Sequence, residues 1–315
     1  MKKVELHVHL DGSVRPSTVS EILDISLEDA KKEMIVSKNN QNLSEYLTKF
    51  SLPLKVMQTK ENLKRISKEL ALDLKKDEVI YAEVRFAPYF HTKEGLSYDE
   101  VVTSILEGIK EVTGIKINLI LCMMRGVDFK YNLETINCAK RFLNNGVVAL
   151  DLAGDEHNYE TKEYEELFEI AKKENIPFTI HAGEADGRDS ILSAIDFGTT
   201  RLGHGIICLE DRNTIKKIKD NKITLEICPT SNIQTKVFNS FKEYPIKKLL
   251  KENILITINT DNRTVSNTTL NKEYDILHKY FNLTNEDFLN FNINALNASF
   301  ISEEEKEQYK NILLS

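Results

Sequence analysis

The sequence predicts an α/β fold, a single (β/α)8 barrel of the TIM type with additional helices at its mouth and at its C-terminus. Short apolar runs rich in β-branched residues alternate with longer charged stretches whose apolar residues recur at helical spacing. About eight such units fill the 315 residues, a normal length for one barrel. No run is followed by a Gly-rich dinucleotide or phosphate loop, which disfavours an open doubly wound sheet.

Eight apolar runs are the candidate strands, and their alternation with helical patterns predicts parallel βαβ units. These runs are Val4–Leu10, Val79–Phe86, Ile117–Met124, Val147–Ala153, Phe178–Ala182, Thr200–Gly203, Thr224–Cys228 and Leu255–Asn259. The stretch Pro16–Asp77 is too long for one crossover helix. We therefore expect it to form several helices, broken near Pro53, that cover the barrel mouth.

Capping signals mark several helix starts in the later part of the chain and one near its beginning. A Ser or Thr followed three residues later by an acidic residue is typical of a helix N-terminus. The pairs are Ser97 with Glu100, Ser302 with Glu305, Thr284 with Asp287 and Ser26 with Asp29. Ser302–Leu314 is expected to be a last amphipathic helix, and residues 1–315 a single catalytic barrel domain.

Composition excludes several classes of protein. The formal net charge is −7 and no dense basic stripe occurs, which argues against a nucleic-acid partner. No apolar run approaches the ~20 residues of a membrane helix, and the N-terminus lacks a signal-peptide core. The four cysteines form no CxxC pair, as expected of free thiols in a reducing compartment. We expect a cytoplasmic protein with a small-molecule substrate; its oligomeric state is left open.

Four of the seven histidines lie at the ends of predicted strands, where a barrel builds its active site. His7 and His9 are two residues apart on the first strand, so both rings point the same way. Two converging imidazoles suit Zn²⁺. Chance alternation on a half-buried strand would give the same pattern, but Asp11 and Gly12 follow directly and favour the metal interpretation.

The fifth and sixth strands end in further polar residues. His181 ends the fifth and is a candidate third ligand, while Glu184 could act as a general acid or be a solvated loop glutamate. His204 stands between two glycines, which disfavours a packing role and favours contact with water.

The eighth strand is followed by two polar residues, Asp261 and Asn262. An Asp at the close of an apolar strand is costly unless it is paired or bound to metal, so Asp261 is a candidate fourth ligand. Its alternative role is to cap the following helix, which Asn262 could do equally well. Three histidines, one carboxylate and water form an open catalytic metal site. Such a site attacks an electrophilic carbon, by hydrolysis or deamination, and residue types alone do not identify that carbon.

Seven motifs, in this order, make the chain similar to the adenosine deaminase family over nearly its whole length. They are VELHVHLDGS at 4–13, DLAGDE at 151–156, HAGEA at 181–185, RLGHG at 201–205, ED at 210–211, CPTSN at 228–232 and NTD at 259–261, and the tail at 292–306 also resembles the family. The resemblance implies an enzyme that hydrolyses adenosine, and 2′-deoxyadenosine, to inosine and ammonia in purine nucleoside salvage. This is a hydrolase reaction on a cyclic amidine C–N bond.

The resemblance implies a metal and catalytic role for six residues. One zinc ion per chain would be held by His7, His9, His181 and Asp261. Glu184 would protonate purine N1 as water attacks C6. His204 would orient or deprotonate that water and stabilise the developing oxyanion.

The resemblance also implies a set of substrate contacts. The backbone N–H of Gly154 would bind N3, and Asp11 would accept a hydrogen bond from the ribose 5′-hydroxyl, with His9 also bordering the substrate. Apolar lid residues beside the sugar would be Tyr46, Leu47 and Phe50. Many members carry a second Asp that contacts N7, where this chain has Asn262. N7 accepts hydrogen bonds, and an amide can donate one, so the replacement is chemically tolerable.

Related activities stay open as alternatives. A deaminase of free adenine or of a modified adenosine would share most of these motifs, although Asp11 favours a nucleoside. An AMP substrate is disfavoured because no Lys or Arg cluster lies near the motifs, with Arg15 and Arg263 the nearest candidates. A dinuclear hydrolase would need a bridging group on the fourth strand, which has Asp151 but no Lys. A non-catalytic purine-binding protein would have lost catalytic residues, and none is lost here.

Overall fold

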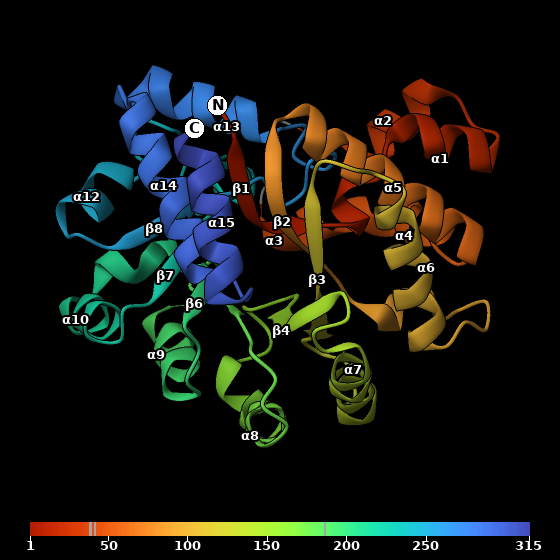
Figure 1. Ribbon diagram of the computed structural model, residues 1–315, viewed down its shortest axis with the longest axis horizontal. Coiled ribbons are helices and arrows are strands. Elements are labelled where there is room, and N and C mark those ends of the chain that lie inside the picture. Colours follow the sequence, from red (N-terminus) through yellow and green to blue (C-terminus); the bar gives the residue numbers. More distant parts are fainter. Residues whose placement is uncertain (38–39, 41, 186) are drawn as a thin grey trace.

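The computed structural model describes residues 1–37, 40, 42–185 and 187–315. In this part of the chain, parallel strands form two four-stranded sheets surrounded by helices (Figure 1). The first sheet has the order β1-β2-β3-β4 and the second β5-β6-β7-β8. The strands are β1 (Lys3–His9), β2 (Val79–Phe86), β3 (Lys116–Met124), β4 (Val147–Ala153), β5 (Ile180–Ala182), β6 (Arg201–His204), β7 (Thr224–Ile227) and β8 (Leu255–Ile258).

Isolated bridges join the two sheets at both of their edges. Leu150 on β4 pairs with Phe178 just before β5, and Val8 on β1 pairs with Asp261 just after β8. Backbone pairing therefore runs round all of these strands, and the predicted (β/α)8 fold is confirmed. The strand predictions hold with shifts of one or two residues. Phe178 was expected to begin β5 but makes only the bridge, and β6 extends through His204.

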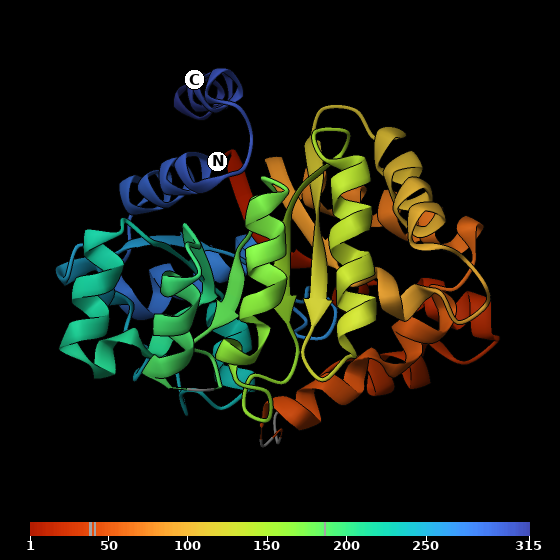
Figure 2. The same cartoon turned by 90° about the horizontal axis from the view of Figure 1, so that it is seen from below.

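Helices follow the strands and pack around the outside of the sheets (Figure 2). They are α1 (Pro16–Leu23), α2 (Leu27–Met34), α3 (Leu43–Leu47), α4 (Ser51–Val56), α5 (Lys60–Lys76), α6 (Tyr98–Lys110), α7 (Phe129–Phe142), α8 (Glu165–Lys173), α9 (Arg188–Asp196), α10 (Arg212–Asp220), α11 (Pro229–Gln234), α12 (Ile246–Lys251), α13 (Leu270–Phe281), α14 (Asn285–Ala298) and α15 (Glu303–Leu314). Within the described residues, no helix has the length and apolar character needed to cross a membrane.

The predicted helix starts are confirmed. Capping boxes begin α6, α14 and α15, and Ser26 caps α2 by accepting from the Asp29 N–H. In the segment 16–77, a boundary falls at Ser51, so Pro53 lies in the first turn of α4, where a missing N–H costs nothing. Only part of this segment, α3 to α4, lines the mouth, because α5 packs against α6. Residues 38, 39 and 41 lie outside the described residues.

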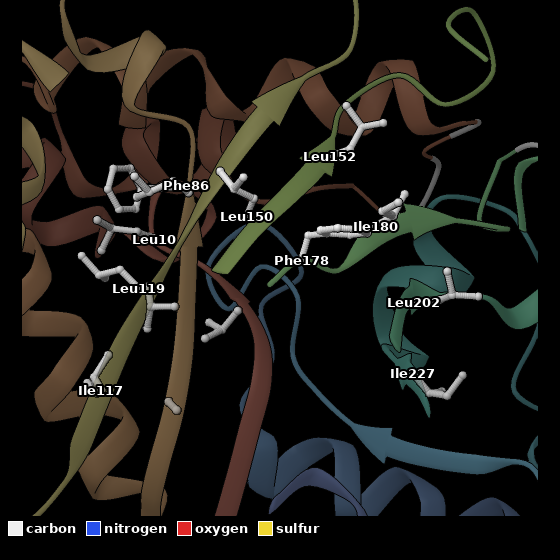
Figure 3. Packing of buried hydrophobic residues seen from close by; sticks show 14 of the residues in the cluster. Leu10, Phe86, Ile117, Leu119, Leu150, Leu152, Phe178, Ile180, Leu202 and Ile227 are labelled. Atoms are coloured by element: carbon white, nitrogen blue, oxygen red, sulfur yellow. The ribbon is translucent and has the colours of Figure 1, made fainter. Parts of the chain in front are cut away.

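The hydrophobic core lies between the sheets and the helices that cover them. Figure 3 shows side chains such as Leu119, Leu150, Ile180 and Leu202, from four different strands, in this core. Each is completely buried. The strands therefore carry an apolar outer face, which leaves their inward-facing positions free for polar residues.

Charged residues cross the interior between the two sheets. Arg201 on β6 forms ion pairs with Glu83 on β2 and with Glu226 on β7, and its guanidinium lies 4.0 Å from the centre of the Phe300 ring. Arg85 on β2 pairs with Glu226 at 2.8 Å. All of these charged side chains are fully buried, so each depends on its partners.

We expect Arg201→Met to lower the free energy of unfolding by about 3–5 kcal/mol, because it leaves the buried Glu83 without its arginine and Glu226 with Arg85 as its remaining arginine. The matched control is Arg141→Met, which removes an exposed ion pair with Asp99 and should cost no more than about 1 kcal/mol. Urea denaturation of both variants measures the difference. Equal losses in the two variants would show that the buried pairs do not hold the sheets together.

Candidate active site

The carboxyl ends of the strands bring four histidines and one aspartate to the same end of the barrel. Strand β1 contributes His7 and His9, β5 contributes His181, and β6 ends at His204. Asp261 follows β8 and pairs with β1. Its N–H donates to the carbonyl of His7 at 2.9 Å, and its carbonyl accepts from the N–H of His9 at 2.7 Å. The β8–β1 edge therefore fixes the aspartate beside the two histidines.

Three imidazole nitrogens and one carboxylate oxygen converge on one point. The Nε2 atoms of His9 and His181 lie 3.3 Å apart, and Oδ1 of Asp261 lies 3.3 Å from Nε2 of both His7 and His9. One ligand atom from each side chain lies within 4.8 Å of all the others. Nε2 of His7 is buried and has no hydrogen-bond partner among the described residues. This donor set fits a bound zinc ion, and the cluster is a candidate metal centre.

A second layer of acidic and polar groups holds the ligand side chains. Oε2 of Glu226 lies 2.9 Å from Nδ1 of His7, and Oδ2 of Asp151 lies 2.9 Å from Nδ1 of His181. The hydroxyl of Ser231 donates to Oδ2 of Asp261 at 2.6 Å. Partners of this kind fix the orientation of ligand rings and direct the free nitrogen toward the metal.

Asp261 of the cluster and His204 beside it adopt left-handed backbone conformations. His204 has φ of 62° and Asp261 has φ of 60°, a region that few residues other than Gly adopt and in which Asn, Asp and His are the most frequent of those few. Both stand where a strand ends and the chain turns away. The helix that follows Asp261 is α13, and Thr269 caps it, so neither Asp261 nor Asn262 is its N-cap.

Glu184 and His204 face each other beside the cluster. Oε2 of Glu184 lies 3.4 Å from Nε2 of His204, and its Oε1 accepts from the Thr235 hydroxyl at 3.3 Å. Burial, together with the negative charges of Asp261 and Glu156, raises the pKa of Glu184 well above its ordinary value. Burial lowers the pKa of His204 well below its ordinary value. These two shifts favour a protonated carboxyl beside a neutral imidazole.

A buried relay orients the His204 ring. The hydroxyl of Tyr244 donates to Oδ1 of Asn232 at 2.9 Å, which leaves the amide nitrogen of Asn232 to donate to Nδ1 of His204 at 3.1 Å. Nδ1 thus acts as the acceptor, and the proton of the neutral ring resides on Nε2, the atom that faces Glu184.

A cavity of about 310 Å³ opens above these groups. The residues that line it are His9, Asp11, Leu43, Tyr46, Leu47, Phe50, Leu54, Ala87, Phe90, Cys122, Met124, Arg125, Ala153, Gly154, Asp155, His181, Glu184, His204, Asp261 and Asn262. Every residue that the sequence assigned to substrate binding lies in this set. His7, assigned only to the metal, lies beneath it.

The polar candidates lie on different sides of the cavity. Burial raises the pKa of Asp11 to about 7, against the opposing effect of the Gly12 N–H, which donates to its Oδ1 at 3.0 Å. Gly154 follows β4 with φ of 106°, which leaves its backbone accessible where a side chain would be strained. Oδ1 of Asn262 packs on Gly12, so closely that a Cβ atom there would lie 1.8 Å away. Asn262 also lines the cavity, and its amide nitrogen is the donor of this side chain.

The predicted lid residues come from α3 and the turn that follows it. Tyr46 is buried, and its hydroxyl lies 2.7 Å from that of Ser266. The ring centres of Tyr46 and Phe50 are 6.4 Å apart. Leu47 lines the cavity on the same side. These side chains form one largely apolar side of the cavity.

Among the described residues that line the cavity, Arg125 is the only Lys or Arg. Its guanidinium is already bound. It donates to the carbonyls of Tyr159 and His181 at 2.7 Å each, and to the Thr161 hydroxyl at 2.9 Å. Arg15 instead pairs with Asp73, and Arg263 pairs with Asp77. The cavity therefore offers a phosphate group little positive charge.

Sequence reasoning missed Glu226, Ser231, Asn232 and Tyr244. A weak signal existed for Glu226, since it is a charged residue inside the apolar strand β7 and is costly to bury without a partner. Ser231 and Asn232 lie in the CPTSN motif, which was noted without a role. Nothing in the sequence marks Tyr244, because only the fold brings it to Asn232.

Comparisons with known proteins agree with this arrangement. The family model described as adenosine deaminase matches residues 2–313. An adenosine deaminase from Clostridium botulinum strain 657 is 44% identical, over 98% of this chain and 97% of its own length. The solved N6-mAMP deaminase from Arabidopsis is 27% identical with a TM-score of 0.89, covering 99% of this chain and 97% of its own. An amidohydrolase from Burkholderia ambifaria, solved with bound Zn, has a TM-score of 0.90 at 18% identity, with 100% and 90% covered, and shares the fold.

The strand-end cluster, the deaminase motifs and a relative of nearly equal length all indicate the same family. The chain belongs to the adenosine deaminase family and is a deaminase enzyme.

Proposed function

We propose that this enzyme hydrolyses adenosine, and 2′-deoxyadenosine, to inosine and ammonia in purine nucleoside salvage, with one zinc ion per chain held by His7, His9, His181 and Asp261. The observation that carries the proposal is the pairing of Glu184 and His204 beside this donor set at the base of the cavity. When bound, zinc would lower the pKa of a water molecule to about 7 and so provide a nucleophile at neutral pH.

The reaction adds water to purine C6 and then releases ammonia. As the oxygen of water attacks C6, the electron pair of the C6–N1 double bond moves to N1, and Glu184 donates its proton there. The raised pKa of Glu184 supports this role, because burial and the nearby charges of Asp261 and Glu156 favour the carboxyl that still carries its proton. The N–H at Nε2 of His204 orients the water and stabilises charge on its oxygen. The attacking water gives one proton to the Glu184 carboxylate, which restores the acid. The C6–N bond to the amino group then breaks as the remaining proton of the C6 hydroxyl passes to that nitrogen and a C6 carbonyl forms.

The cavity residues would hold the nucleoside so that purine C6 and N1 lie next to the catalytic groups. Gly154 would donate its N–H to N3, Asn262 would donate to N7, and Asp11 would accept from the 5′-hydroxyl, with His9 beside the sugar. Tyr46, Leu47 and Phe50 would cover the substrate. The occupied state of Arg125 supports a nucleoside rather than a nucleotide.

The same proposal treats residues 1–315 as one catalytic domain and places the enzyme in the cytoplasm. The cysteines Cys122, Cys138, Cys208 and Cys228 are free and buried, which supports a reducing compartment.

A substrate panel tests the proposed function. We expect kcat/KM for adenosine to exceed that for AMP, N6-methyl-AMP and adenine by at least about 100-fold. The phosphate of a nucleotide would lie near the Asp11 carboxyl, and Arg125 is already bound to other groups. Adenine has no 5′-hydroxyl and would leave Asp11 without a hydrogen-bond partner. Loss of absorbance near the adenosine maximum follows the reaction. A preference for either nucleotide would overturn the nucleoside assignment in favour of the activity named for the Arabidopsis structure.

Replacing the proposed acid should uncouple chemistry from binding. We expect Glu184→Gln to lower kcat by about 10²–10⁴-fold while KM and zinc content stay near those of the wild type. In the wild type, kcat should fall as the pH rises through the raised pKa of Glu184, because only the protonated carboxyl can donate. Glu94→Gln, at an exposed turn, is the matched control. Near-normal kcat in Glu184→Gln would remove this residue from the acid role.

The contact between Asn262 and N7 can be isolated by a substrate change. 7-Deazaadenosine has no N7 acceptor, so the wild type should lose about 1–3 kcal/mol of transition-state binding with it relative to adenosine. Asn262→Ala should lose most of this discrimination while keeping its zinc. Should the wild type treat both substrates alike, Asn262 does not bind N7.

A further inference from the structure

Glu156 is a buried carboxylate that the reaction scheme leaves without a role. It ends the DLAGDE motif after β4 and is 1% exposed. Its Oε1 accepts from the Gly183 N–H at 2.6 Å, and its Oε2 accepts from the N–H groups of Glu184 at 2.9 Å and Ala185 at 2.8 Å. The Ser190 hydroxyl also donates to Oε1. One side chain thus binds three consecutive backbone donors of the loop that carries the proposed acid.

These hydrogen bonds fix the backbone position from which the Glu184 side chain extends. Three consecutive N–H groups directed at one anion form a concave anion-binding loop, which is rigid while the anion is present. Gly183 has φ of 79°, which lets the loop turn its N–H groups to one side. Glu156 itself does not line the cavity, within the described residues, so it contacts the loop rather than the substrate.

The loop is also tied to the metal-ligand strand. The Ser190 hydroxyl lies 2.6 Å from that of Thr161, and Thr161 accepts from Arg125, which also donates to the carbonyl of His181. A continuous chain of hydrogen bonds therefore runs from His181 to Glu156 and on to the backbone of Glu184. Such a chain keeps the acid at a fixed position relative to the candidate metal centre.

We propose that Glu156 is the positioning residue of the acid step: its carboxylate holds the backbone at 183–185 so that the Glu184 carboxyl meets purine N1. This inference rests on the proposed function. The negative charge of Glu156 has a second effect, since burial, Asp261 and Glu156 together raise the pKa of Glu184. The other groups that face the Glu184 carboxyl are His204 and the Thr235 hydroxyl, while Asp155, His157 and Lys236 line an adjoining outer cavity with it.

The test measures kcat, KM and zinc content of Glu156→Gln with adenosine. We expect kcat to fall about 10- to 100-fold, because a small displacement of an acid costs about this much. KM and zinc content should stay within about 2-fold, since Gln has the same shape and the substrate contacts are intact. The alkaline limb of the kcat profile should move to lower pH, because a neutral side chain no longer raises the pKa of Glu184. Glu163→Gln, an exposed change nearby, should alter none of these.

A double variant separates positioning from general structure. If Glu156 acts through Glu184, then Glu156→Gln combined with Glu184→Gln should be no slower than Glu184→Gln alone. The inference would be overturned if the kcat losses of the two single variants multiply in the double variant. It would also be overturned if Glu156→Gln has the kcat and pH profile of the wild type. A wild type that does not deaminate adenosine would instead overturn the proposed function.

A milder variant covers the case in which Glu156→Gln does not fold. Ser190→Ala removes one donor to the carboxylate and leaves the three backbone bonds in place. It should lower kcat a few-fold in the wild-type background and not at all in the Glu184→Gln background. An equal loss in both backgrounds would contradict positioning through Glu184.

Discussion

The site depends on two buried carboxylates beneath the barrel mouth, Glu226 and Asp151. Burial alone would raise the pKa of Glu226, but the charges of Arg85 and Arg201 lower it below its ordinary value, and Asp151 is likewise held ionised by His181 and Arg85. Each acid therefore carries a negative charge in the interior that must be neutralised. Asp151 contacts Arg85 and His181, and Glu226 contacts two arginines and His7. One set of contacts therefore crosses the two sheets and fixes the rings of His7 and His181.

Because the imidazole rings are held in place, the candidate metal ligands already have the orientation that binding a metal ion requires. Nδ1 of His7 contacts Glu226, and Nδ1 of His181 contacts Asp151. Each contact directs the other ring nitrogen, Nε2, toward the point where the ligand atoms converge. The two residues proposed to act in catalysis, His204 and Glu184, are also held by neighbouring polar side chains. Asn232 holds the ring of His204, and Glu156 holds the loop of Glu184, each through contacts outside the cavity. Neither Asn232 nor Glu156 is among the described residues that line the cavity, so both hold the groups of our proposal from outside it.

The sequence predicted the residues that share a local pattern, and it missed those defined only by the fold. His7, His9, His181 and Asp261 stand at strand ends, so topology alone brings them together, and periodicity revealed the strands. Glu226 lies 219 residues from His7, and Asn232 lies 28 residues from His204, so no local pattern could pair them. Strand β5 was predicted too long because Phe178 is apolar and buried although it makes only one bridge. The capping alternative for Asp261 failed because α13 begins further on, at Leu270.

The most direct test of this account is anomalous diffraction at the zinc edge from crystals of protein purified without chelators. The account predicts one zinc peak per chain, in contact with Nε2 of His7, His9 and His181 and with Oδ1 of Asp261. A Glu226→Gln variant should weaken that peak, because Nδ1 of His7 loses its charged partner. A fully active crystal form with no transition-metal peak, or with the peak elsewhere, would contradict the claim that this cluster is the centre of the reaction.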